Sequence, residues 1–258
     1  IEEDAGYHRD ISVELAKILR QMVSLHEKKV SDDLEEGMDV SVLIAGLGNR
    51  EVTPDALGPK VVDHLFITRH IINEFGHYAF SDEKTSRISG IVPGVMAQTG
   101  MECVEILRGI IKETEPDFII TVDALAARNV KRLNRTIQLT DTGITPGSGI
   151  GNHRNALNQE SLGIPVISLG VPTVVNAATI VADAMNDLIE AETGSNADLK
   201  NLDEHERQEL ARELLSPQLN GLFVTPKNID DSIKQLSFLI SEGLNIALLG
   251  NKDENANI

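Results

Sequence analysis

The sequence predicts an α/β fold of three layers, with helices on both faces of a mostly parallel central sheet. Between about residues 40 and 190, short apolar runs alternate with segments whose apolar residues recur at helical spacing. The run that ends at Gly46 is almost continuously apolar, which is typical of a parallel strand buried on both faces. Aliphatic residues must fill the core, because aromatic residues make up only 3% of the 258 residues.

Each element follows from a local pattern. The first strand ends at Gly46, and Leu57, Val61 and Leu65 then repeat at the spacing of one helix face. Thr99 and Glu102 form a capping-box pattern that predicts the start of another helix. The predicted strands are 40–45, 88–92, 118–122, 136–139 and 165–169, and the predicted helices are 57–72, 100–115, 175–189 and 226–240.

We expect a single domain over residues 1–258. Its predicted parts are an acidic N-terminal helical segment at 1–39, an α/β core at 40–190, a flexible loop at 191–202, and C-terminal helices packed on the core at 203–258. The chain begins at Ile1 and lacks the basic and apolar regions of a signal peptide, so we expect a fragment or a processed product. No apolar run approaches the roughly 20 residues of a membrane-spanning helix, which predicts a soluble protein without membrane partners.

Charge and cysteine content narrow the class of protein. Lys and Arg number 23 against 40 Asp and Glu, for a net charge of −17, and the acidic excess lies in the outer segments, 1–40 and 181–258. Such flanks disfavour direct nucleic-acid binding and would attract a basic protein, although they also serve solubility alone. The single cysteine excludes a disulfide framework and a cysteine-based zinc site, which fits a reducing, cytoplasmic compartment.

Asp55 and Asp123 are the main candidates for chemistry. Each follows the end of a predicted buried strand, and ligands of parallel sheets bind beyond the carboxyl ends of the strands. Two nearby carboxyl groups can divide general acid and base work on a water molecule. Both residues also suit another role, as caps of helices beginning at residues 56 and 124. Spacing alone favours the capping role of both aspartates over the catalytic role.

Other motifs are weaker. The glycines of 46–48 resemble a dinucleotide-binding loop, but Glu51 occupies the third glycine position and would repel a pyrophosphate. No histidine pair has metal-ligand spacing, which disfavours a zinc site on a helix, so no cofactor is expected, although a bound metal is not excluded. His153, in a glycine-rich loop, is either an exposed loop residue or a partner of the carboxylates, and Cys103 fits core packing.

Two further groups of polar residues are candidates for substrate binding. Asp141 follows a predicted strand and is a third carboxylate that would orient the pair. A basic cluster follows Asp123 and suits either a solvated helix face or the recognition of an acidic substrate side chain. Its members are Arg128, Lys131, Arg132 and Arg135.

These loops strongly resemble the germination protease family of spore-forming bacteria. The matching motifs cover most of 40–190 and resume at about 205–250. They are Gly46-Leu47-Gly48-Asn49, Thr53-Pro54-Asp55-Ala56-Leu57-Gly58-Pro59, Ile91-Val92-Pro93-Gly94-Val95-Met96, Asp123-Ala124-Leu125-Ala126-Ala127-Arg128, Asp141-Thr142-Gly143-Ile144, Pro146-Gly147-Ser148-Gly149, Gly163-Ile164-Pro165-Val166 and Val224-Thr225-Pro226-Lys227. A weaker likeness runs to hydrogenase maturation proteases, which share a Gly-x-Gly-Asn loop on a similar α/β sheet.

The resemblance implies an endopeptidase that begins the degradation of small acid-soluble spore proteins at germination and cuts after a glutamate. It implies an atypical aspartic-type enzyme whose two essential aspartates fall on Asp55 and Asp123, which raises both above the capping role. It also implies a homotetramer made as a zymogen, in the cytoplasm of the spore core. Position further suggests Gly48 and Asn49 as oxyanion-stabilising groups and Arg128 as the residue that binds the substrate glutamate.

Two alternatives remain open. A metal-dependent peptidase of the hydrogenase-maturation type would lose activity on prolonged chelation. An inactive acidic binder of basic spore proteins would bind without cleavage. The chain starts beyond the position where the family's propeptide is expected, so propeptide control is not readable from it. The segment near 192–200 is also shorter than the connection usual in the family.

Overall fold

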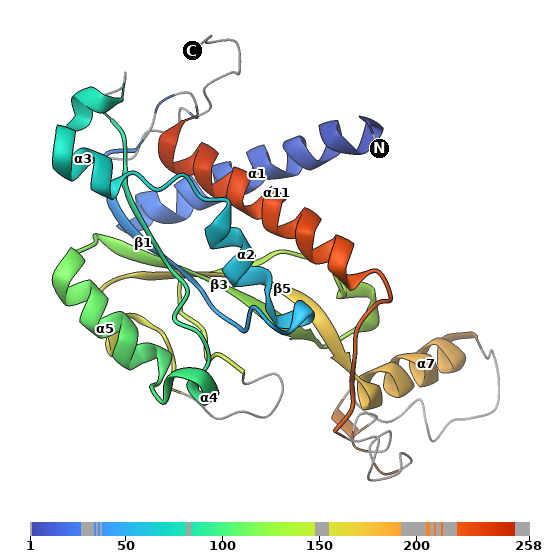
Figure 1. Ribbon diagram of the computed structural model, residues 1–258. Coiled ribbons are helices and arrows are strands. Elements are labelled where there is room, and N and C mark those ends of the chain that lie inside the picture. Colours follow the sequence, from blue (N-terminus) through green and yellow to red (C-terminus); the bar gives the residue numbers. More distant parts are fainter. Residues whose placement is uncertain are drawn as a thin grey trace. The chain divides into compact units, whose positions relative to one another are not determined.

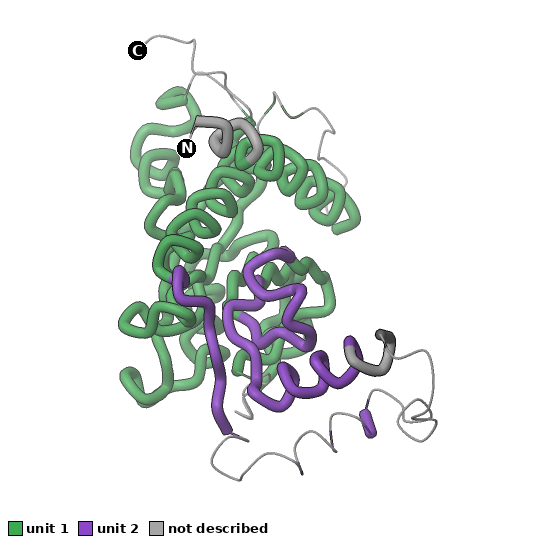
Figure 2. Tube along the Cα trace, turned by 90° about the vertical axis from the view of Figure 1, so that its right-hand side faces the viewer, with its two compact units in different colours: residues 1–124, 138–170, 230–258 green, residues 125–137, 171–229 purple. Residues whose placement is uncertain are grey.

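The computed structural model describes residues 2–26, 34, 36, 38–80, 84–147, 155–191, 205–206, 209, 213 and 221–250. Two compact units are present (Figure 2). Unit 1 comprises residues 1–124, 138–170 and 230–258, and unit 2 comprises 125–137 and 171–229. The single-domain expectation stays a prediction, and the loop expected at 191–202 lies outside the described residues except for its first position.

The central sheet has the strand order β2-β1-β3-β5-β4. The strands are β1 Ser41–Gly46, β2 Arg87–Ile91, β3 Phe118–Ala127, β4 Gln138–Thr140 and β5 Val166–Asn176. Strand β1 pairs in parallel with β2 on one side and with β3 on the other, with Gly46 opposite Val122. The short β4 pairs antiparallel with β5. The sheet is therefore mostly parallel, as predicted.

Helices cover both faces of the sheet in unit 1, as the three-layer prediction requires (Figure 1). One side carries α1 Glu2–His26, α2 Leu57–Asp63 and α11 Ile229–Leu249; the other carries α4 Met96–Thr99, α5 Cys103–Thr114 and α6 Gln159–Leu162. The α3 helix spans Arg69–Phe75, and short 3-10 turns occupy η1 Thr53–Asp55 and η2 His77–Ala79.

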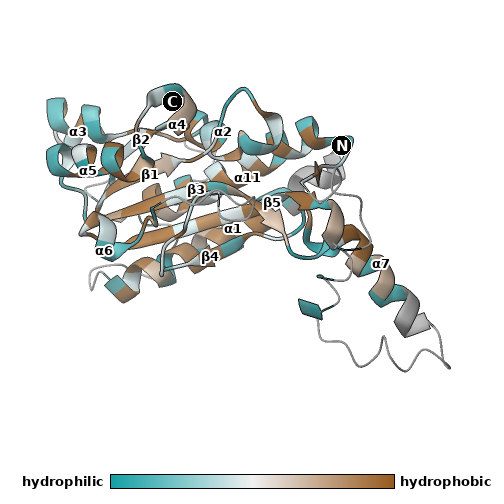
Figure 3. Cartoon of the chain, turned by 90° about the horizontal axis from the view of Figure 1, so that it is seen from below, coloured by the Kyte–Doolittle hydropathy of each residue, from teal (hydrophilic) through white to brown (hydrophobic). Residues whose placement is uncertain are grey.

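The core on the α5 side follows the alternation of the strands. Figure 3 shows the strands coloured mainly as hydrophobic. The apolar residues that gather between the sheet, α5 and α6 are Leu43, Ala45, Leu47, Val104, Leu107, Ile119, Leu157, Leu162 and Val166. Odd-numbered residues of β1 and β3 face this layer, because successive side chains point to opposite faces of a strand. By the same alternation, Asp123 belongs to this face.

The segment predicted as one helix over 57–72 is two helices. The α2 helix ends at Asp63, and α3 begins only after Thr68. The buried Thr68 hydroxyl donates to the Ser86 carbonyl and accepts the N–H of Ile88, so residue 68 is fixed to the neighbouring strand. The periodicity of the sequence gives no indication of these two tertiary hydrogen bonds.

The helix predicted to be capped by Thr99 begins three residues later. Glu102 is its N-cap, and the Glu102 N–H donates to the Glu105 carboxylate at 2.8 Å. The Thr99 hydroxyl instead accepts the N–H of Met101. The capping-box prediction therefore had the right motif in the wrong register.

The C-terminal helix was predicted well. Of the stripe of apolar residues expected to pack on the main body, Ile229, Ile233 and Ile240 are buried. Of the C-terminal helices expected at 203–258, the stretch 203–220 lies outside the described residues except at positions 205, 206, 209 and 213. Among the helices that the structure describes, none is long and apolar enough to cross a membrane.

Unit 2 contains residues 125–127 of β3, residues 171–176 of β5, the 3-10 turn η3 Val130–Arg132, helix α7 Ala177–Ala191 and strand β6 Phe223–Val224. Strand β6 pairs antiparallel with the end of β5. Asp183 of α7 accepts hydrogen bonds from the Asn129 side chain and the Val130 N–H, which fastens η3 to α7.

Candidate active site

The strand order places a topological switch point between β1 and β3. Chain continuation from β1 leads to β2 on one side, whereas β3 lies on the other side of β1. In such sheets, ligands bind in the crevice beyond the carboxyl ends of the two strands where the order reverses. Asp55 lies in the loop that follows β1, and Asp123 lies just beyond the Gly46–Val122 pair on β3. Both predicted carboxylates therefore belong to the switch point.

The loop after β1 folds back so that its backbone holds Asp55. The Asn49 N–H donates to the Asp55 carboxylate at 2.8 Å and lies 3.2 Å from the Asp55 carbonyl oxygen. Asp55 ends η1, and the N-cap of α2 is Ala56. The hydrogen bond from Asn49 thus comes from the β1 end of the loop, which is not what a helix cap would receive.

Two glycines permit this close packing. Gly48 has φ +115°, and a Cβ there would lie 2.0 Å from the Asp55 carbonyl oxygen. A Cβ on Gly58 would lie 2.4 Å from the Val122 carbonyl oxygen. Any side chain at either position would push the Asp55 loop away from the strand ends, so these motif glycines set the position of the carboxylate.

Asp123 lies inside a strand. Asp123 is only 5% exposed, and one of its carboxylate oxygens accepts the N–H of Ala124 at 2.9 Å. Residues 124–127 continue β3, where the capping interpretation required a helix. The structure therefore excludes the cap role for Asp123. The loops of the two aspartates also meet, because the Leu47 N–H donates to the Val122 carbonyl at 2.8 Å.

A third loop joins the same edge. The Gln98 side chain, from the segment after β2, donates to the Asn49 side-chain oxygen at 3.3 Å. The same oxygen accepts the N–H of Glu51 at 3.0 Å. Sequence reasoning missed Gln98; its only signal was its place just after the Pro93-Gly94-Val95-Met96 motif.

Arg50 ties the Asp55 loop to α2. Its guanidinium makes two hydrogen bonds with the Asp63 carboxylate, at 2.5 and 2.7 Å. These bonds and the opposite charge lower the pKa of Asp63 below its ordinary value of 3.8 and raise the pKa of Arg50 above its ordinary value. Neither residue was singled out from the sequence, because a pair 13 positions apart has no local signature.

Asp141 does not reach the edge where Asp123 lies. It follows β4, whose antiparallel pairing places Gln138 opposite Gly170 and Thr140 opposite Ser168. The Ser168 hydroxyl is bonded to that of Thr121, two residues before Asp123. The chain therefore moves away from the carboxyl edge as it approaches Asp141, by about 3.3 Å per residue. Reversal of strand direction, invisible in the sequence, separates this carboxylate from the pair.

The other predicted groups divide between unit 2 and residues that are not described. Arg128 is exposed and belongs to unit 2, directly after β3. Part of the basic cluster is used for structure, because Lys131 pairs with Asp187 at 3.4 Å. His153 lies outside the described residues, which hold no group of three or more His, Cys, Asp or Glu side chains suited to a metal ion.

Paired carboxylates at the switch point of an α/β sheet define a class of site suited to activating water. The comparisons with known proteins specify it further. The germination protease family model matches residues 2–199 and 196–258. The germination protease of Clostridium perfringens strain SM101 is 43% identical over 256 residues, covering 96% of this chain and 74% of its own. That of Caldanaerobacter subterraneus is 43% identical over 255 residues, covering 96% and 75%.

The chain belongs to the germination protease family, and it is a peptidase. Two similar solved structures are a hydrogenase maturation protease from Thermococcus kodakarensis and a hydrogenase-maturating endopeptidase from E. coli. The first is 18% identical, covers 80% of this chain and 92% of its own, and has a TM-score of 0.35. The second is 15% identical, covers 58% and 89%, and has a TM-score of 0.31.

Proposed function

We propose that this peptidase begins the degradation of small acid-soluble spore proteins during spore germination by cutting after a glutamate, with Asp55 and Asp123 activating water. The observation that carries the proposal is the position of both carboxylates at the switch point between β1 and β3. Family membership supports the peptidase activity. The resemblance of the motifs supports the substrate and the cleavage rule.

The proposed mechanism divides proton transfer between the two carboxyl groups. One, ionised, takes a proton from the attacking water, and the other, protonated, gives a proton to the leaving amide nitrogen. Burial disfavours the charged form of a carboxyl group. Asp123 is the more buried of the two, so we assign it the proton and Asp55 the role of base.

We propose for the Asn49 N–H a role other than the oxyanion contact expected from the sequence. It is engaged by Asp55, so donation to an oxyanion would require that this hydrogen bond break first. We propose that Asn49 orients the Asp55 carboxylate. Contact of Gly48 with the substrate carbonyl stays a prediction, and an inhibitor-bound structure tests it.

The wider biological setting is also proposed. A chain with a net charge of −17 attracts basic protein substrates by long-range electrostatics. The resemblance adds a homotetramer, zymogen processing and a location in the spore core. Sedimentation of the purified chain tests the tetramer.

The test compares the parent chain with Asp55→Asn and Asp123→Asn on a purified small acid-soluble spore protein. Asp39→Asn is the matched control, because this exposed carboxyl precedes β1 at the opposite edge of the sheet. We expect cleavage after glutamate by the parent and the control, and a loss of at least a hundredfold in both site variants, on the scale of general acid–base catalysis. Circular dichroism checks that each variant is folded.

Other outcomes redirect the proposal. Full activity in either site variant would remove that aspartate from the mechanism. Loss of activity after prolonged chelation would favour the metal-dependent alternative. Binding of the spore protein without cleavage by any form would favour the inactive binder.

A further inference from the structure

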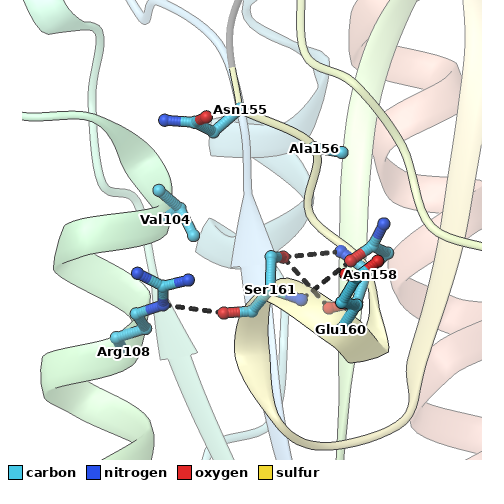
Figure 4. A pocket seen from close by; sticks show the side chains of 7 residues that line it. All are labelled: Val104, Arg108, Asn155, Ala156, Asn158, Glu160 and Ser161. Atoms are coloured by element: carbon cyan, nitrogen blue, oxygen red, sulfur yellow. Dashed lines mark hydrogen bonds between the residues drawn. The ribbon is translucent and has the colours of Figure 1, made fainter.

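A polar cavity lies between α5 and α6, on the face of the sheet to which Asp123 belongs. Its volume is about 410 Å³, which is within the usual range of roughly 300–1,000 Å³ for small-molecule sites. Figure 4 shows Arg108 of α5 facing residues of α6 across this space. The lining residues are Val104, Arg108, Asn155, Ala156, Asn158, Glu160 and Ser161.

The Arg108 guanidinium is anchored through Nε, which leaves its two terminal nitrogens available to a ligand. Its Nε donates to the Ser161 carbonyl at 2.7 Å. Among the described residues, the two terminal nitrogens have no hydrogen-bond or ion-pair partner, although Glu160 also lines the cavity. A planar guanidinium anchored at Nε presents a fork that fits the two oxygens of a carboxylate.

Two asparagines, Asn158 and Asn155, also line the cavity. Asn158 uses its side-chain oxygen to accept the Ser161 N–H at 2.9 Å, which leaves its amide NH₂ as a donor. Across the rim, Asn155 donates through its side chain and its backbone N–H to the Glu102 carboxylate, at 2.6 and 3.2 Å. The negative charge of Glu102 is thus already bound to hydrogen-bond donors.

The segment that follows β2 links the cavity to the candidate active site. Glu102 precedes α5 at the end of the segment that follows β2, and Gln98 of the same segment contacts Asn49. From Val104 to Arg108 is one helical turn, about 6 Å along α5. The lining residues of α5 therefore lie within its first two turns, close to the segment that reaches Asn49.

We propose that this cavity binds an acidic side chain of the polypeptide substrate, with Arg108 as the specificity-determining residue. This inference rests on the proposed function, under which the side chain is the glutamate at the cleavage site. It moves that role from Arg128, which the sequence suggested, to a residue anchored in unit 1. The negative charge of Glu160 repels the bound carboxylate and lowers the affinity of the cavity for it.

The test measures kcat/KM of the full chain on two peptides that differ only by glutamate or glutamine at the cleavage position. The parent should prefer glutamate, and Arg108→Gln should reduce that preference by about tenfold, as expected for one charge-assisted hydrogen-bonding partner. Glu160→Gln should increase it. Lys112→Gln, which removes a positive charge one turn further along α5 without touching the cavity, should leave the preference as in the parent.

Binding separates this inference from the proposed chemistry. The affinities of both peptides for the Asp123→Asn chain, measured by calorimetry, should differ by a similar factor and depend on Arg108 in the same way. An unchanged preference in Arg108→Gln, or its loss in Arg128→Gln instead, would overturn the role of Arg108. A parent that cuts neither peptide, but binds the glutamate peptide more tightly through Arg108, would contradict the proposed function alone.

Discussion

The backbone N–H of Asn49 donates a 2.8 Å hydrogen bond to the carboxylate of Asp55, six residues further along the chain. This bond turns the loop after β1 back on itself and presents Asp55 at the edge where β3 delivers Asp123. It depends on Gly48, whose positive φ and missing side chain allow the approach.

Gly48→Ala should therefore remove activity. The new methyl group would lie 2.0 Å from the Asp55 carbonyl oxygen, so the loop must move and carry the carboxylate with it. The strained backbone should also lower the free energy of unfolding, by about 1–3 kcal/mol. Peptide cleavage and thermal unfolding measure both effects.

Gly100→Ala is the matched control. Gly100 also has positive φ, but a Cβ there meets nothing within 4 Å. It should lose about 1 kcal/mol of stability and keep its activity. Equal activity in the two variants would show that the Asp55 loop tolerates displacement.

Asp63→Asn tests the ion pair that ties the Asp55 loop to α2. Both side chains are almost half exposed, so the loss of stability at neutral pH should stay below about 1 kcal/mol. Because the pKa of Asp63 is lowered in the folded chain, the pair stabilises it above the ordinary value of 3.8 and ceases to do so as pH falls through the lowered value. The difference between parent and variant should vanish there, and a difference that grows in acid would contradict this account.

Arg20→Met should destabilise the chain strongly. The Arg20 side chain is 1% exposed, and it donates from Nε to the Ala247 carbonyl at 2.9 Å and from a terminal nitrogen to the Glu36 carbonyl. The variant leaves buried carbonyls at the end of α11 without this donor, at a cost of about 2–4 kcal/mol in the free energy of unfolding. Lys17→Met, which removes an exposed partner of Glu14, should cost under about 0.5 kcal/mol. Similar denaturation midpoints for the two variants would show that these hydrogen bonds of Arg20 do not stabilise the end of α11.

The hydroxyl pair of Thr121 and Ser168 should behave as a coupled unit. The two oxygens lie 2.8 Å apart and are buried between β3 and β5. Thr121→Val alone leaves the Ser168 hydroxyl in need of another partner and should cost about 1–2 kcal/mol. The double variant Thr121→Val with Ser168→Ala should cost less than the sum of the single variants. Additive costs in a double-mutant cycle would show that the two hydroxyls are independent.

Much of the fold followed from periodicity. Runs of mainly apolar residues predicted β1, β2 and β3, and the apolar residues that recur from Ile229 to Ile240 predicted the buried face of α11. These signals are local, because burial of a strand or of one helix face sets the spacing of apolar residues. The sequence did not predict the break between α2 and α3, because Thr68 is held by hydrogen bonds to residues about 20 positions away.

For the site, the sequence by itself determined which residues have the right chemistry: two aspartates after buried strands, with glycines beside one of them. It left the capping role of Asp123 open, and the continuation of β3 through residue 127 excludes that role. It placed Asp141 with the pair, whereas antiparallel pairing of β4 carries that residue away. The cavity at Arg108 came from the tertiary structure alone. The direction of a strand and the packing of two helices depend on contacts between distant segments, and local residue patterns do not encode them.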